Sequence, residues 1–280
     1  MTNTPSSPVP RTWFITGATS GIGHELLKQA IAAGENVVAV ARDVSSFDNE
    51  AGRHLLAIAA DVVDQASIKA AVDAGVSKFG RLDVIANNAG YGLFGAVEES
   101  TDEQARAIFD TNVFGTLNVI RATLPVLRAQ GSGHILEGSS FFGQISQPGV
   151  GLLSATKYAV EGIADALADE VAPLGIKVTI VQPGMTATPF LSNLKASENT
   201  YSDYDQTVRA VYEAIGAMPA DSFASAERVA TGIRTAIESA QPPRRLALNG
   251  AGAEAMKAGL EARLRDIEEW SSIAQAVDAA

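Results

Sequence analysis

Residues 12–23 read Thr-Trp-Phe-Ile-Thr-Gly-Ala-Thr-Ser-Gly-Ile-Gly, a short apolar run followed by three glycines. The run predicts a buried strand, and the glycines predict a tight turn that opens into a helix. Gly17 permits the sharp turn, Gly21 lets the backbone approach a pyrophosphate, and Gly23 allows close helix–strand packing. The free amides and the positive dipole end of the helix then favour an anion. The stretch therefore predicts a dinucleotide-binding unit.

Further apolar runs alternate with segments of helical spacing along the rest of the chain. Most runs are continuous, which is typical of strands covered on both faces. The alternation predicts a doubly wound (Rossmann-type) α/β fold, with a mostly parallel seven-stranded sheet and helices on both faces. A capping box at Thr101–Gln104 marks one helix start. The expected strands are Thr12–Thr16, Asn36–Ala41, Leu55–Ala60, Leu82–Asn87, His134–Ser139, Lys177–Gln182 and Leu246–Leu248.

No linker divides the chain, so we expect a flexible tail over residues 1–10 and a single domain over residues 11–280. The polar, low-periodicity stretch at about 186–225 follows the sixth expected strand and is a candidate substrate lid. One last helix is expected at about 253–277. Its apolar stripe is expected to pack on the domain rather than bind a partner; the stripe consists of Met256, Leu260, Leu264, Ile267, Ala274 and Val277.

Composition excludes several classes of function. With 46% hydrophobic residues the chain is too apolar for disorder, and the absence of cysteine excludes thiol chemistry and disulfides. A net charge of −11 argues against nucleic acid as a partner. No run is long enough for a membrane span, and the three histidines are too scattered to suggest a metal site. We expect a soluble, cytoplasmic protein without a metal.

Short motifs follow the glycine turn near the ends of the expected strands: Asp61-Val62, Asn87-Asn-Ala-Gly90, Asn112, Gly138-Ser-Ser140, Ser154-Ala-Thr-Lys157 and Pro183-Gly184 with Thr188. Together with Thr16–Gly23, they resemble the signature of the short-chain dehydrogenases/reductases over about residues 12–190. The resemblance implies hydride transfer between a nicotinamide cofactor and a carbonyl or alcohol. It also implies a set of cofactor-binding residues: Gly17, Thr19, Ser20, Gly21, Ile22, Gly23, Asp61, Val62, Asn88, Ala89, Gly90, Lys157, Pro183, Gly184 and Thr188.

The end of the second expected strand indicates which cofactor is used. A carboxylate there would bind the ribose of NAD, but the chain has Ala41 followed by Arg42 and Asp43. The planar guanidinium of Arg42 can bind a 2′-phosphate. The alternative is a solvated cation that pairs with Asp43. We expect NADP(H), in preference to NAD(H).

The resemblance assigns three catalytic positions directly. Ser140 would orient the substrate oxygen, Lys157 would hold the ribose and lower the pKa of a catalytic tyrosine, and Asn112 would support a proton-relay water. The tyrosine itself is missing. Its position, four residues before Lys157 and thirteen after Ser140, is occupied by Leu153, which can neither donate nor accept a proton.

Three interpretations of Leu153 remain open. In the first, the chain is a silenced or atypical reductase. One general acid raises the reaction rate by about 10²–10⁴-fold, so its loss weakens hydride transfer without abolishing it. In the second, the chain acts on a C=N substrate that needs no tyrosine. In the third, it binds the cofactor without catalysis. Tyr158 lies about 140° round the helix from Leu153 and is expected to pack, and Tyr91 is a slightly better substitute acid.

The remaining expectations concern Glu137, the function, the oligomeric state and the substrate pocket. Glu137 lies within the fifth expected strand, and we favour a paired structural carboxylate over a substrate-facing group. The function expected is an NADP(H)-dependent oxidoreductase for a small carbonyl or secondary-alcohol substrate with an apolar part. The family resemblance also implies a homodimer or homotetramer built from the fourth and fifth long helices. An apolar substrate pocket is expected from Phe141, Phe142, Met185, Phe190 and Leu191, for each of which plain core packing is an equal alternative.

Overall fold

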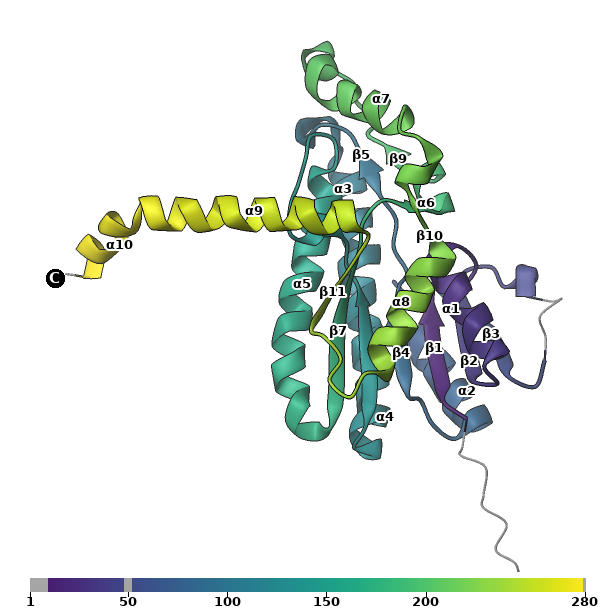
Figure 1. Ribbon diagram of the computed structural model, residues 1–280. Helices are drawn as coiled ribbons and strands as arrows, with labels where there is room; N and C mark the ends of the chain where they lie inside the picture. Colours follow the sequence, from purple (N-terminus) through teal and green to yellow (C-terminus); the bar gives the residue numbers. More distant parts are fainter. Residues whose placement is uncertain (1–9, 48–51, 279–280) are drawn as a thin grey trace, which may run out of the picture.

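The computed structural model describes residues 10–47 and 52–278, so the expected tail lies outside the described residues except for Pro10. Seven strands form one parallel sheet in the order β11-β7-β6-β4-β1-β2-β3 (Figure 1), which confirms the predicted α/β fold. These strands are β1 (Thr12–Thr16), β2 (Asn36–Ala41), β3 (Leu55–Ala59), β4 (Val84–Asn87), β6 (Gly133–Gly138), β7 (Ile176–Pro183) and β11 (Arg245–Leu248).

The predicted strand ends are within two residues of the observed ones. The largest difference is at β4, which begins at Val84 rather than Leu82. The backbone of Leu82 is instead bonded by the side chain of Gln130, which accepts from Leu82 N at 3.0 Å and donates to Leu82 O at 2.6 Å. Four short strands form two further parallel pairs that the sequence did not indicate: β5 (Leu93–Phe94) with β9 (Lys195–Ala196), and β8 (Thr186–Ala187) with β10 (Ala224–Ser225).

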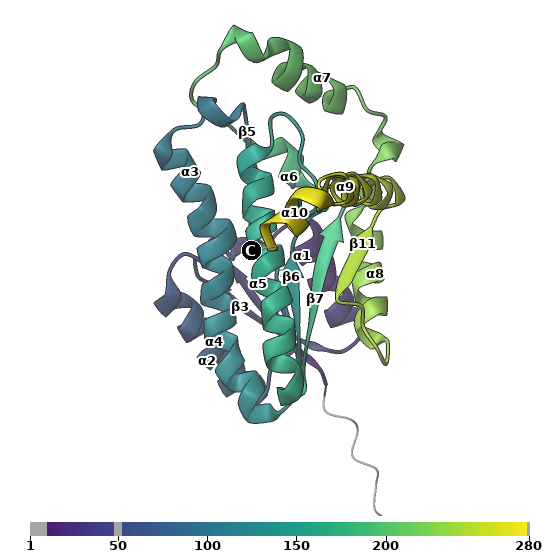
Figure 2. The ribbon, with the colours of Figure 1, turned by 90° about the vertical axis from the view of Figure 1, so that its left-hand side faces the viewer.

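Helices cover both faces of the sheet (Figure 2). They are α1 (Gly21–Ala32), α2 (Gln65–Phe79), α3 (Asp102–Phe109), α4 (Gly115–Gln130), α5 (Gly151–Val171), α6 (Pro189–Ser192), α7 (Ala210–Gly216), α8 (Ala226–Glu238), α9 (Gly250–Glu269) and α10 (Ser271–Asp278). Trp13 and Ile15 of β1 belong to the core on the side of α1 and α8, whereas Phe14 belongs to the core beneath α2, α4 and α5. This alternation is the reason for the continuous apolar strand, because both faces are buried. None of the helices in the described part of the chain has the length and apolar character that crossing a membrane requires.

The chain reverses its direction of winding between β1 and β4. From β1 it proceeds through β2 to β3 at one edge, and from β4 it proceeds through β6 and β7 to β11 at the other. Ligands of open parallel sheets bind beyond the carboxyl ends of the strands at such a reversal. The fold therefore places the glycine turn after β1 beside the motif after β4.

The capping box predicted at Thr101 and Gln104 is confirmed, with reciprocal hydrogen bonds of 3.2 and 3.3 Å. The helix it opens, α3, continues into one π-helical turn at Asp110–Phe114 before α4 begins. Such π turns interrupt regular backbone bonding and are frequent at functional sites. Asn112 lies in this turn.

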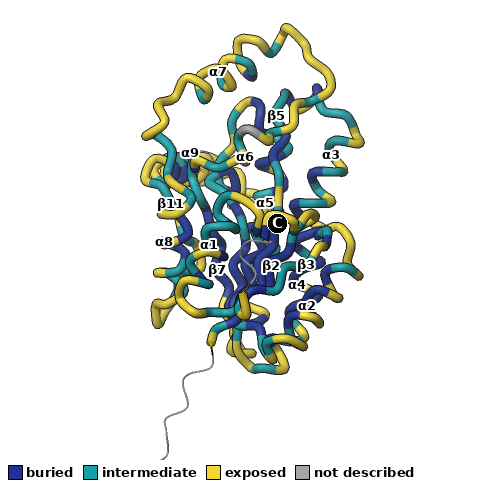
Figure 3. Tube along the Cα trace, turned by 90° about the vertical axis from the view of Figure 1, so that its right-hand side faces the viewer, coloured by how far each residue is buried: buried dark blue, intermediate teal, exposed yellow. Residues whose placement is uncertain are grey.

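The stretch at 186–225 is more regular than the sequence indicated, since it contains α6, α7 and the three short strands β8, β9 and β10. The 3₁₀ turn Val97–Glu99 anchors it: the buried carboxylate of Glu99 accepts from Tyr201 N at 2.8 Å and from Arg209 Nη1 at 2.8 Å. The outer part, around α7, is largely exposed (Figure 3). A long-range ion pair thus fixes the middle of this segment to the turn Val97–Glu99.

The prediction of one packed C-terminal helix was wrong. The helix is divided at Trp270 into α9 and α10, and α9 extends away from the sheet as an arm (Figure 1). Of the predicted stripe only Met256 is buried; its other members are exposed, namely Leu260, Leu264, Ile267, Ala274 and Val277. The arm leaves the domain soon after Met256. The periodicity of the sequence therefore identifies one apolar face of the helix, but beyond Met256 the domain does not cover this face.

Candidate active site

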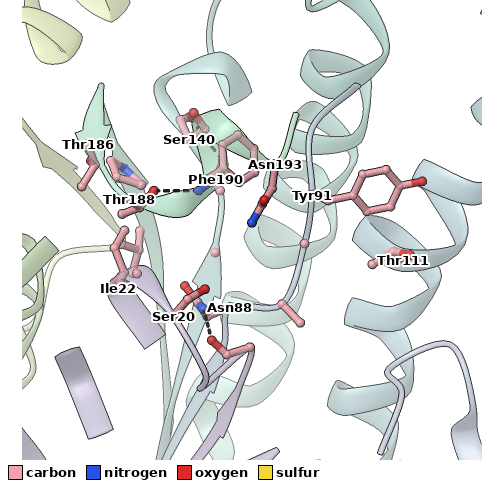
Figure 4. A pocket seen from close by; sticks show the side chains of 18 of the residues that line it. Ser20, Ile22, Asn88, Tyr91, Thr111, Ser140, Thr186, Thr188, Phe190 and Asn193 are labelled. Atoms are coloured by element: carbon pink, nitrogen blue, oxygen red, sulfur yellow. Dashed lines mark hydrogen bonds between the residues drawn. The ribbon is translucent and has the colours of Figure 1, made fainter. Parts of the chain in front are cut away.

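A cavity of about 840 Å³ lies beyond the carboxyl ends of β1, β4, β6 and β7. It is continuous from the glycine turn to the residues after β7, and Figure 4 shows several of its side chains. Nearly every predicted site residue lines it: Gly17, Thr19, Ser20, Gly21, Ile22, Arg42, Asp61, Val62, Asn88, Ala89, Gly90, Ser140, Leu153, Lys157, Pro183, Gly184 and Thr188. Gly23 and Asn112 lie behind this wall.

The glycine turn has the geometry that the sequence predicted. Gly17 and Gly21 have φ values of +65° and +56°, in the region that side chains other than glycine rarely adopt. A Cβ on Gly23 would lie 2.4 Å from the carbonyl oxygen of Gly17, so only glycine fits there. The first residues of α1 line the cavity. This backbone concavity at a helix N-terminus suits the pyrophosphate of a dinucleotide.

The side chain of Thr16 couples the glycine turn to the motif after β4. Its hydroxyl oxygen accepts from the backbone amides of Asn88 at 3.0 Å and Ala89 at 3.1 Å. The side-chain amide of Asn88 in turn donates to Thr16 O at 3.2 Å. These bonds hold the glycine turn and the motif after β4 in one fixed relation.

The residues expected at the adenosine end line the same cavity. Arg42 follows β2 and is exposed, and Asp61 follows β3. The carboxylate of Asp43 accepts from Ser45 N at 2.9 Å and so caps its own turn. Arg42 itself lines the cavity.

Ser140, Leu153 and Lys157 border one part of the cavity, although they come from two elements. Ser140 begins the 3₁₀ turn Phe141–Gly143 after β6, and its Oγ accepts from Phe142 N at 3.2 Å. Lys157 donates from Nζ to Gly138 O at 2.7 Å, one turn of α5 after the buried Leu153. An aliphatic side chain therefore stands where the family resemblance places a proton donor.

Asn112 organises the site from behind. Its Oδ1 accepts from Tyr91 N at 3.0 Å, and its Nδ2 donates to Tyr91 O at 2.9 Å and to Thr156 Oγ1 at 3.1 Å. A Cβ on Gly90 would lie 3.0 Å from Asn112 Oδ1 and 3.7 Å from Lys157 Nζ. The π turn thus joins the motif after β4 to the helix that carries Lys157.

Burial changes the acid–base properties of two groups here. Desolvation lowers the pKa of Lys157 to about 8, although the nearby Glu137 raises it. Desolvation also raises the pKa of Glu137 to about 8, opposed by Asn87, its partner across β4 and β6, and by Lys157. Glu137 is fully buried in β6 and does not line the cavity.

Glu161, which the sequence did not single out, holds the serine segment. This buried carboxylate accepts hydrogen bonds from Ser139 Oγ (2.7 Å), Gln144 Nε2 (2.8 Å), Gln182 Nε2 (2.8 Å) and Arg245 Nε (2.9 Å). Its donors come from four places along the chain, which is why no local pattern revealed it. Glu161 fixes both ends of the turn that begins at Ser140.

The two tyrosines considered as substitute acids lie in different surroundings. Tyr158 does not line the cavity; the guanidinium of Arg263 lies over its ring at 5.0 Å and contacts its hydroxyl. Tyr91 lines the cavity, but its ring points away from Ser140 (Figure 4), and Lys195 Nζ lies 4.6 Å from its centroid. Burial and the charge of Asp110 raise the pKa of Tyr91.

One end of the cavity is apolar. Phe141, Phe142, Met185, Phe190 and Leu191 all line it, as do Asn193 and Lys195 from the segment that follows α6. The sequence did not indicate Asn193 or Lys195, because they belong to no motif and reach the cavity only through the pairing of β9 with β5.

Comparison with known proteins identifies the family. The family model for short chain dehydrogenases matches residues 11–199, so the chain belongs to this family of oxidoreductases. Oxidoreductase BOA17 of Botryotinia fuckeliana is 32% identical over 94% of this chain and 98% of its own length. A short-chain dehydrogenase structure from Streptomyces avermitilis has a TM-score of 0.87 and 35% identity, covering 95% of this chain and 98% of that one.

Another similar solved structure was determined with a bound cofactor. The 3-ketoacyl-(acyl-carrier-protein) reductase from Brucella melitensis, complexed with NADH, has a TM-score of 0.72 and 28% identity. It covers 86% of this chain and 96% of its own. A nicotinamide dinucleotide is consistent with the glycine turn, the cradle at Gly23 and the long cavity described above.

Proposed function

We propose that this chain is an NADP(H)-dependent oxidoreductase for a small carbonyl or secondary-alcohol substrate that has an apolar part. The observation that carries the proposal is a single cavity in which the glycine turn, Ser140 and Lys157 meet an apolar end. Arg42, at the adenosine end, favours the 2′-phosphate of NADP(H). The nicotinamide supplies or accepts the hydride when bound.

The residues of the chain position the reactants. Ser140 Oγ donates a hydrogen bond to the substrate oxygen, and the Lys157 ammonium, held against Gly138 O, holds the cofactor ribose. Asn112 keeps the backbone of Tyr91 and the side chain of Thr156 in place behind them. The segment at 186–225, which contributes Phe190 and Leu191 to the cavity, serves as a substrate lid that excludes water.

Leu153 favours two alternatives to ordinary carbonyl reduction. Without a proton donor beside Ser140, an iminium substrate is suited to the site, because adding hydride to a C=N⁺ group needs no proton. A cofactor-binding protein without turnover is the other alternative. Both alternatives retain cofactor binding in the cavity. They differ from carbonyl reduction because neither needs a proton donor at position 153.

One comparison distinguishes these functions. NADPH affinity and carbonyl-dependent NADPH oxidation are measured for the unmodified chain, for Leu153→Tyr and for the matched control Leu153→Phe, which adds the ring without the hydroxyl. We expect tight NADPH binding throughout and a gain of about 10²–10⁴-fold in kcat/KM for Leu153→Tyr alone. Binding without turnover in any form indicates the binding role. Turnover of a preformed iminium by the unmodified chain indicates C=N reduction.

A further inference from the structure

One lysine lies where the cavity is otherwise apolar. The charged side chains that line the cavity are those of Arg42, Asp61, Lys157 and Lys195. Arg42 and Asp61 follow β2 and β3, at the proposed adenosine end, and Lys157 donates to Gly138 O. Lys195 belongs to β9, in the segment that follows α6 and lines the apolar end. Among the described residues that line this end, no carboxylate accompanies Lys195, so its positive charge is not neutralised there.

Two contacts hold Lys195 in this position. Its backbone amide donates to Gly92 O at 3.0 Å, beside the pairing of β9 with β5. Its Nζ lies 4.6 Å from the centroid of the Tyr91 ring, within the range of a cation–π interaction. Because the Tyr91 ring points away from Ser140 (Figure 4), the ammonium lies at the far side of this end rather than beside the proposed position of the substrate oxygen.

The ammonium of Lys195 is available to a ligand. No ion pair or side-chain hydrogen bond joins it to another residue in the described part of the chain. Lys195 also borders a smaller cavity of about 320 Å³, but the carboxylate in that lining, Glu99, accepts from Arg209. Asp110, whose charge acts on Tyr91, lines neither cavity. The three N–H donors of Lys195 can therefore bind an anionic group that enters the cavity.

The neighbouring side chains indicate which anion fits. Asn193 also lines this end, and in the view of Figure 4 its side chain lies between Ser140 and Tyr91. A carboxylate accepts hydrogen bonds from both an ammonium and a side-chain amide. A doubly charged phosphate is better matched by the planar fork of an arginine, and no arginine is among the described residues that line this end. One lysine and one amide therefore favour a single carboxylate.

We propose that Lys195 recognises a carboxylate at the far end of the substrate, so that an apolar chain separates this carboxylate from the reacting carbonyl or alcohol carbon. The substrate is then an oxo acid or the corresponding hydroxy acid. This inference rests on the proposed oxidoreductase function and names its substrate class. The carbonyl lies at Ser140, the apolar chain lies along Phe190 and Leu191, and the carboxylate lies at Lys195. Because the chain as a whole carries a net charge of −11, a cation inside the cavity supplies the local attraction that such an anion needs.

The first experiment compares substrates that differ by one charge. In the Leu153→Tyr background, NADPH oxidation is measured with a series of linear oxo acids, each with a methyl ketone at one end and a carboxylate at the other, and with the methyl ester of each. We expect the best acid to exceed its ester in kcat/KM. Lys195→Met should lower the ratio of acid to ester by about fivefold or more, a modest effect because Lys195 is exposed and partly screened by water.

Two further variants control this comparison. Lys195→Arg retains the charge and should retain the preference for the acid. Lys177→Met removes an exposed lysine at the amino end of β7, which does not line the cavity, and should leave the ratio unchanged. An unchanged ratio in Lys195→Met overturns the proposal. If KM for NADPH rises while the ratio stays constant, Lys195 binds the cofactor rather than the substrate, and the proposal is again overturned.

The second experiment measures binding without turnover. Calorimetry titrates the same acids and esters into the NADPH-loaded unmodified chain and into Lys195→Met. The best acid should bind the unmodified chain more tightly than its ester, and Lys195→Met should remove that difference; equal binding of acid and ester by the unmodified chain overturns the proposal. If the acid binds through Lys195 but no form of the chain oxidises NADPH, the oxidoreductase function fails and the carboxylate site stands. If esters are reduced and acids neither bind nor react, the function stands and the carboxylate site fails.

Discussion

Glu161 accepts a 2.7 Å hydrogen bond from Ser139 Oγ and thereby connects the middle of α5 to the residue before Ser140, for which we propose the role of orienting the substrate. The same carboxylate bonds Gln144, at the far end of the Ser140 turn, and Gln182 of β7. A buried acceptor with so many donors cannot be replaced by an amide without leaving a donor unpaired. We therefore propose that Glu161 is a positioning residue for Ser140.

We expect Glu161→Gln, made in the Leu153→Tyr background, to lower kcat by about tenfold or more, because a displaced serine loses its hydrogen bond to the transition state. NADPH affinity is expected to stay within about twofold, since the glycine turn is not touched. Steady-state kinetics and fluorescence titration with NADPH measure the two effects. Asp165→Asn is the control: Asp165 also pairs with Arg245, one turn further along α5, but no hydrogen bond joins it to the serine segment in the described structure.

The sequence predicted the geometry of the glycine turn well because the determinants of that turn are local. The turn from Thr16 to Gly23 needs glycine for backbone reasons, and the apolar run before it needs burial on both faces. The roles of Glu161 and Lys195 had no local signal. Glu161 meets donors 17 to 84 residues away, and Lys195 reaches Tyr91 only through a two-residue strand pair.

The C-terminal arm shows a different limit of sequence reasoning. The stripe with Leu260, Leu264 and Ile267 was predicted correctly as one helix face, since periodicity depends only on the helix. Periodicity does not specify the surface against which a face packs. The same pattern suits packing on its own domain or on a second copy.

The second prediction concerns Arg42 and the choice of cofactor. Arg42→Ala should raise KM for NADPH by about 10–100-fold, the effect of losing one charge-assisted hydrogen bond. KM for NADH should change little, because NADH carries no 2′-phosphate. Arg128→Ala, at an exposed position in the last turn of α4, is the control and should leave both values unchanged. Equal increases for NADPH and NADH would exclude the proposed role of Arg42.

The third prediction tests the tether of the proposed lid. Arg209 bonds the buried carboxylate of Glu99 and, at 2.6 Å, Tyr201 O. In the double variant Glu99→Gln/Arg209→Met, protease cleavage within residues 196–216 should accelerate and KM for substrate should rise. The melting transition of the central sheet should change little. Arg106→Met, which removes an exposed partner of Asp102 on α3, serves as the control. Unchanged cleavage and KM would show that the tether does not hold the segment closed.

The ion pair between Glu99 and Arg209, which tethers the proposed lid, should also weaken in acid. Hydrogen bonding from Arg209, opposed by burial, lowers the pKa of Glu99 from 4.5 to about 2. A carboxyl whose folded-state pKa is lowered stabilises the fold above its unfolded pKa, and that contribution is lost as the pH falls through the folded value. Cleavage of the segment should therefore increase between about pH 4.5 and 2 in the unmodified chain, and less steeply in the double variant.

The last prediction concerns Glu137, whose pKa is raised by burial from 4.5 to about 8. Between these values the folded state binds a proton that the unfolded state has released, so stability falls as the pH rises from about 4.5 to 8. Glu137→Gln keeps the shape and cannot titrate. Relative to the unmodified chain it should therefore gain stability with rising pH, by about 2–4 kcal/mol from pH 5 to pH 8, since one pKa unit corresponds to about 1.36 kcal/mol.

Urea unfolding at pH 5, 6.5 and 8 measures this difference. The lowered pKa of Lys157 acts in the opposite direction, but only between about 8 and 10.5, so it lies outside this range. Glu103→Gln, an exposed carboxyl on α3, controls for the loss of one charge. If the stability curves of Glu137→Gln and the unmodified chain run parallel from pH 5 to 8, then Glu137 is ionised in the folded protein. Glu137 would then be a buried carboxylate that the nearby charge of Lys157 keeps ionised, rather than a neutral acid.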